Sequence, residues 1–104
     1  MKKIKVNPGI CGLESIITAV SEDGAEVNVT VETKCKNVQA FFEAIEQPVD
    51  AFEVCFAKPG SGTVYEAGDQ LAHGACPVPA ALIKCIEAEC SLALPANVTF
   101  EFVE

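Results

Sequence analysis

The sequence predicts a small α+β domain, in which an antiparallel sheet of three to four strands carries helices packed on one of its faces. Two observations lead to this fold class. Polar and apolar residues alternate in the first third of the chain, and from Asn37 onward the apolar residues return with the period of a helix. Half of the 104 residues are hydrophobic, and we find no internal repeat or linker. Residues 1–104 are therefore expected to form a single domain with a true core.

The first three elements are predicted to be strands. Lys3–Val6 alternates between polar and apolar residues and ends at an Asn-Pro-Gly sequence. Glu14–Val20 and Ala25–Thr33 flank the segment Ser21–Gly24, whose Asp-Gly pair is typical of a β-hairpin turn. Valines at every second position of the later arm predict a sheet with one buried face and one solvated face.

The helical part begins at Asn37, and its first helix must end before Pro48 because the residue preceding a proline disfavours the helical conformation. The apolar stripe of this helix consists of Val38, Phe41, Phe42 and Ile45. For Val49–Ala57 two interpretations remain open, a short strand or an extended connector.

Two further helices and a last strand complete the predicted order β-β-β-α-α-α-β. A loop rich in glycine and proline leads into a helix over Thr63–Ala72, and Pro79 suits the first turn of the last helix. Pro95 then interrupts the chain, and Val98–Phe102 alternates as a final strand. The apolar stripe of the last helix is formed by Val78, Leu82, Cys85 and Ile86.

Charge and hydropathy narrow the classes of function. The net charge is −8 with only seven Lys and Arg residues, which disfavours a nucleic-acid partner because phosphate contacts need cations. No apolar stretch is long enough to span a bilayer or to act as a signal peptide, so we expect a cytoplasmic protein and no membrane partner. In a reducing cytosol, the six cysteines are expected to be free thiols, metal ligands or reactive groups rather than disulfides.

Three of the cysteines are expected to be part of the core. Cys85 lies on the apolar stripe of the last helix, Cys90 lies one turn beyond Ile86, and Cys55 lies within a Val-Cys-Phe run. Free cysteine is among the most buried residue types, so packing is the favoured role for all three.

The other three cysteines stand at element boundaries. Cys11 precedes Gly12 in a loop, Cys35 joins the third strand to a helix, and Cys76 lies just ahead of the last helix. The N-terminus of a helix favours the thiolate form of a nearby cysteine, and the thiolate is the form that binds metal or attacks sulfur. These three residues are therefore predicted to share a functional site.

His73 is the candidate for a fourth ligand. It lies three residues before Cys76, and a curled turn between them would let imidazole and thiolate reach one ion in a Cys3His zinc set. The alternative is a histidine at a helix end that stabilises the last carbonyls. No triad can be drawn around Ser15 or Ser91, so a binding role is favoured over an enzymatic one.

The cysteine pattern resembles that of the U-type iron–sulfur-cluster scaffold proteins, the NifU N-terminal/SufE-like family. Cys11, followed by Gly12, matches the loop cysteine of that family. Cys35 matches the family's second cysteine, which stands at the start of the first long helix. Cys76 matches the third, which stands at the start of a late helix. Leu13 stands where the family has an aspartate, and Ala75 where it has a histidine. The resemblance implies a NifU/SufE-like fold and a cluster bound at these three cysteines.

The leading hypothesis is a domain that holds or relays zinc, another metal or an iron–sulfur cluster through Cys11, Cys35 and Cys76, with His73 or an exogenous group as fourth ligand. Its expected partner is a cluster- or sulfur-transfer protein. A rival hypothesis is a thiol-active protein that accepts persulfide sulfur on a single activated cysteine, with Cys76 as the candidate. The third alternative is a small interaction domain with purely structural cysteines.

Overall fold

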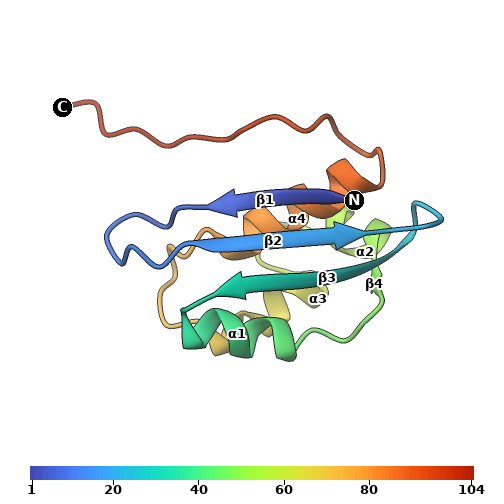
Figure 1. The fold of residues 1–104 in the computed structure, drawn as a ribbon, viewed down its shortest axis with the longest axis horizontal. Coiled ribbons are helices and arrows are strands. Elements are labelled where there is room, and N and C mark those ends of the chain that lie inside the picture. The colour runs from blue at the N-terminus through green and yellow to red at the C-terminus, as the bar shows by residue number, and fades with distance from the viewer.

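The computed structural model describes residues 1–104 and shows a four-stranded antiparallel sheet in the order β1-β2-β3-β4 (Figure 1). The strands are β1 (Lys2–Val6), β2 (Ser15–Val20), β3 (Glu26–Thr33) and β4 (Val49–Asp50). The first three form a meander, and β4 pairs antiparallel with the beginning of β3. The predicted α+β class, the three N-terminal strands and their antiparallel pairing are thereby confirmed.

The hairpin between β2 and β3 closes through side chains of its turn. The carboxylate of Asp23 accepts hydrogen bonds from the backbone N–H of Ala25 and of Glu26, each 2.9 Å long. These N–H groups, that of Glu26 first, lower the pKa of Asp23 below its ordinary value. Gly24 has a φ of +75°, a left-handed conformation that glycine adopts without cost. The Asp-Gly signal therefore predicted this turn correctly.

The helices cover one face of the sheet. They are α1 (Lys36–Glu43), α2 (Ala51–Phe56), α3 (Gly62–Glu66), the 3-10 helix η1 (Ala67–Gln70) and α4 (Val78–Glu89). Figure 1 shows α2, α3 and α4 behind the sheet, and α1 along β3. None of the helices is long and apolar enough to cross a membrane.

The core lies between the helices and the face of the sheet that they cover. On the strands its fully buried side chains include Ile17, Ala19 and Val27, while their neighbours in sequence point to the open face. The stripes predicted for the first and last helices are buried as expected. These buried stripe residues are Val38, Phe41 and Phe42 of α1 with Ile45 just after it, and Val78, Leu82, Cys85 and Ile86 of α4.

Two segments differ from the sequence prediction in the middle of the chain. Val49–Ala57 is neither one strand nor a connector, because Asp50 caps a helix there by accepting hydrogen bonds from the N–H groups of Phe52 and Glu53. The helix expected over Thr63–Ala72 is shorter and divided into α3 and η1.

The prediction of a final strand over Val98–Phe102 is wrong for the single chain. Residues 93–104 belong to no helix or strand, and those from Leu94 onward make no backbone hydrogen bond to any other segment. The alternating pattern is present, but a strand forms only when it pairs with a neighbour. The edge strand β1 pairs with β2 and makes no pairing with the C-terminal segment.

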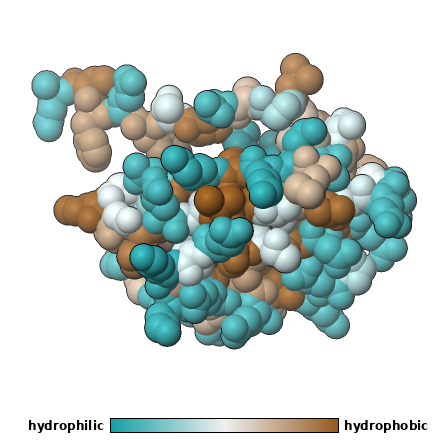
Figure 2. Space-filling model, viewed as in Figure 1, coloured by the Kyte–Doolittle hydropathy of each residue, from teal (hydrophilic) through white to brown (hydrophobic).

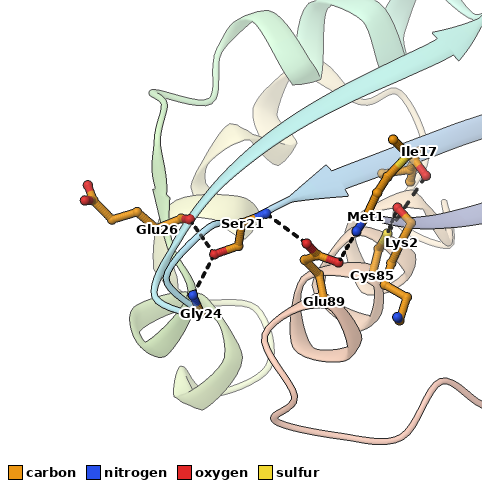
Figure 3. A network of polar contacts seen from close by, with 8 residues as sticks. All are labelled: Met1, Lys2, Ile17, Ser21, Gly24, Glu26, Cys85 and Glu89. Atoms are coloured by element: carbon orange, nitrogen blue, oxygen red, sulfur yellow. Dashed lines mark hydrogen bonds and ion pairs between the residues drawn. The ribbon is translucent and has the colours of Figure 1, made fainter.

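A polar network fixes the end of α4 against the sheet (Figure 3). The carboxylate of Glu89 accepts a 2.9 Å hydrogen bond from the N–H of Ser21 and lies 3.0 Å from the amino group of Met1. The Ser21 N–H first, and the Met1 amino group second, lower the pKa of Glu89. The Cys85 thiol contacts the carbonyl oxygen of Lys2 at 3.4 Å. The C-terminus of α4 is thereby held where β1 begins and β2 ends.

Candidate functional site

Two of the six cysteines are buried in the core, and burial raises the pKa of these two and of a third, Cys55. Cys85 and Cys90 on α4 are buried, and Cys55 on α2 is half-buried against the core. Burial is the main cause that raises the pKa of all three, that of Cys55 to about 11 with a further contribution from the charge of Glu87. Metal ligation and nucleophilic attack need the thiolate, which a raised pKa disfavours, so a packing role suits these three cysteines. The predicted core placement is confirmed for Cys85 and Cys90, whereas Cys55 is only partly buried against the core.

The other three cysteines lie in loops and at helix starts, and two of them, Cys35 and Cys76, also pack against the core. Cys11 is exposed in the loop between β1 and β2. Cys35 is half-buried at the N-cap position of α1, and its backbone N–H donates to the hydroxyl of Thr33 at 3.1 Å. Cys76 is half-buried and stands two residues before α4.

The fold brings the segments that carry these cysteines to one end of the sheet, which we call the cysteine end. Ser15 at the start of β2 pairs with Val6 at the end of β1 and with Thr33 at the end of β3. The loop 7–14 and the junction 34–35 therefore emerge together. Since Glu89 fixes the C-terminus of α4 at the opposite end, the N-terminus of α4 and the segment 71–77 also reach the cysteine end (Figure 1).

The side chains themselves are not assembled into a ligand set. No three His, Cys, Asp or Glu side chains are arranged to hold a metal ion in this structure. The loop that carries Cys11 is shaped by Gly9 and Gly12, both with positive φ, and is closed by a 3.0 Å hydrogen bond from the Gly12 N–H to the Gly9 carbonyl. A Cβ at either glycine would meet no atom within 4 Å, so open space surrounds this loop.

His73 lies at the cysteine end but not in a helix. It begins a turn that is closed by a 3.2 Å hydrogen bond from the Cys76 N–H to the His73 carbonyl oxygen, and it is exposed. The chain between His73 and Cys76 therefore curls, as a shared ion would require. The alternative of a residue at a helix end is wrong, because η1 ends at Gln70 and His73 lies three residues beyond it.

A surface hollow at the cysteine end was not predicted from the sequence. It lies between the loop 7–14 and the end of β3, and its lining includes the neighbours of two candidate cysteines, Gly12 and Lys34. Two carboxylates, Glu14 and Glu32, contribute to the same lining. No pattern in the sequence marks this hollow, because it forms only when the end of β1, the start of β2 and the end of β3 lie side by side.

The model of a family described as a family of unknown function, DUF6951, matches residues 2–102. No curated protein and no solved structure matches the chain.

Proposed function

We propose that this chain, which belongs to the DUF6951 family, holds or relays a thiophilic metal ion or an iron–sulfur cluster through Cys11, Cys35 and Cys76. One observation carries the proposal. The segments with these three cysteines reach the same end of the sheet, while burial raises the pKa of the other three thiols. Thiolates are the ligands that select zinc, copper(I) and iron–sulfur clusters, so a metal of this class is the expected cargo.

Binding would need a change in the loop between β1 and β2. Cys35 and Cys76 are attached to the starts of helices that pack on the core, whereas Cys11 lies in a loop with open space around it. We therefore expect the loop 7–14 to move toward the other two thiols and close the ligand set. His73, in the turn before Cys76, is the candidate for the fourth position, and a group from a cluster- or sulfur-transfer partner is its alternative.

Metal binding should depend on these three cysteines and not on the buried ones. Protein purified anaerobically is expected to bind one equivalent of zinc, and changing Cys11, Cys35 and Cys76 together to serine should abolish it because serine is a poor zinc ligand. Native mass spectrometry with a competing chelator measures both. The matched control is Cys55→Ser, which should leave the zinc content unchanged. Metal-free wild-type protein after zinc addition, or loss of zinc in Cys55→Ser, contradicts the proposal.

A second candidate function needs only one thiol. Cys76 is half-buried and stands two residues before α4, a helix of 12 residues whose dipole favours a negative charge at its start. Val78 and Ala80 supply backbone N–H groups there, whereas Pro77 and Pro79 have none. As a sulfur acceptor, the Cys76 thiolate would attack the outer sulfur of a donor persulfide. A new S–S bond forms on Cys76, and the donor leaves as its own thiolate, so no external oxidant is needed.

Alkylation separates the candidate thiols from the structural ones. In native, metal-free protein at neutral pH, iodoacetamide is expected to modify Cys76 well before Cys55, Cys85 and Cys90, whose pKa values are raised by burial. Peptide mass spectrometry over time gives the order of labelling. Equal labelling rates at all six cysteines would show that burial does not make Cys55, Cys85 and Cys90 less reactive than Cys76. Protection of Cys76 by added zinc favours the metal proposal over the sulfur-acceptor function.

A further inference from the structure

The last part of the chain carries five large hydrophobic side chains that are exposed to solvent. We call Leu94–Glu104 the C-terminal tail. Figure 1 shows it as an extended chain, and Figure 2 shows apolar residues on it standing clear of the body of the molecule. Phe100 is 90% exposed and Phe102 is 99% exposed. Aromatic side chains in this state favour burial against a partner.

The tail has the pattern of a strand with two different faces. Val98, Phe100 and Phe102 fall on one face, and Thr99 and Glu101 fall on the other. Such a pattern fits an edge position in a sheet that is covered by helices on one side and open to solvent on the other. The match to the family extends to residue 102, so this strand pattern belongs to the family's domain.

Of the two edge strands of the sheet, β1 with five residues is long enough to pair with such a strand, whereas β4 has only two residues. The far edge is occupied, because β4 pairs with the start of β3 and the side-chain amide of Gln47 bonds to both the N–H and the carbonyl of Val29, at 2.7 and 2.9 Å. The outer edge of β1 has no neighbour. Its unpaired backbone groups are a template for another strand.

Both faces at the β1 edge match the tail. On the helix side of β1, Ile4 is only half-buried. The Cys85 thiol of α4 contacts Lys2 of β1, and the same side of α4 carries Ala81 and Ala88, two small residues that are also half-buried. This leaves apolar surface for Phe100 and Phe102 to cover. On the open side, Lys3 and Lys5 are exposed, and their positive charges would lie beside the carboxylate of Glu101.

We infer that the C-terminal tail of one copy adds as a strand to the outer edge of β1 in a second copy, and that the exchange is reciprocal. Within one chain the tail runs in the same direction as β1 (Figure 1) and forms no strand with it. A two-fold axis perpendicular to the strands reverses that direction. The tail then lies antiparallel to β1 of the partner, in the more stable mode of pairing, and one self-complementary contact buries both tails.

The oligomeric state tests the inference. Under reducing conditions, sedimentation equilibrium of the full chain over a range of concentrations is expected to show a dimer. Changing Phe100 and Phe102 together to aspartate should weaken self-association by at least about 100-fold, because two buried aromatic anchors are lost. The matched control is Phe56→Asp, which alters another exposed phenylalanine, on α2, and should leave the dimer intact. A monomer, or a dimer that survives loss of the tail aromatics, overturns the inference.

Two further measurements separate pairing between copies from pairing within one chain. Amide hydrogen exchange should show protection of residues 98–103 that rises with protein concentration; protection independent of concentration would mean that the tail closes on its own β1, and the inference fails. Glu101→Lys should weaken the dimer, and combining it with Lys3→Glu and Lys5→Glu should restore it. Absence of this rescue contradicts the proposed register. Neither measurement depends on metal binding at the cysteine end.

Discussion

Replacing Phe41 with alanine is expected to lower the free energy of unfolding by about 3–5 kcal/mol. Phe41 lies on the buried stripe of α1, is fully inaccessible to solvent, and meets the ring of Phe42 edge-to-face at 5.4 Å between centroids. Alanine would remove the buried ring and leave a cavity that the surrounding strands and helices can fill only in part. Since domains of this size are stable by about 5–15 kcal/mol, this loss is a substantial share of the total stability.

Urea unfolding followed by circular dichroism measures this loss. The matched control is Phe56→Ala, because Phe56 is 71% exposed and has its main aromatic contact with Phe52 at 6.2 Å. This control should change the free energy of unfolding by less than about 1 kcal/mol. Similar losses in the two variants would show that Phe41 is not the centre of the core.

Replacing Gly62 with alanine is expected to lower the free energy of unfolding by about 2–3 kcal/mol. Gly62 has a φ of +91°, where an L-residue with a Cβ is strained. The added Cβ would also lie 2.6 Å from a carboxylate oxygen of Glu53 and 3.0 Å from the Cβ of Ala57. That carboxylate would have to move, and it would lose its 3.0 Å hydrogen bond from the N–H of Thr63 at the start of α3.

The neighbouring Gly60 separates the two causes. It has a φ of +85°, but a Cβ there would meet no atom within 4 Å. Gly60→Ala should therefore lose only the conformational part, about 1–2 kcal/mol. Urea unfolding of both variants measures the difference. If Gly60→Ala is as destabilising as Gly62→Ala, the contact with Glu53 contributes nothing.

The strands were predictable because their apolar residues alternate and their hairpin has an Asp-Gly turn. The first and last helices were predictable because their apolar stripes follow one face. The segment around Asp50 was harder, since a single capping carboxylate decides there between a strand and a helix. The final strand was predicted from a correct pattern, but its formation depends on a free edge, which belongs to the tertiary structure and not to the segment itself.

The candidate site was predictable only in part. The burial of Cys85 and Cys90 follows from their positions on the stripe and end of a helix. The common end reached by the segments of Cys11, Cys35 and Cys76 depends on strand order and on the direction of α4, and no local pattern encodes either. The distances between side chains depend on loop conformation, so a ligand set cannot be read from spacing alone.

The packing of α4 across β1 and β2 has a consequence for the nascent chain. The strands leave the ribosome first, but the helix that covers Ile17 and Ala19 is synthesised last among the regular elements. At about 5–20 residues per second, translation takes several seconds to pass from β3 to the end of α4. During that interval the apolar face of the three-stranded meander is exposed to water, and a chaperone that recognises apolar β-rich segments can bind to it.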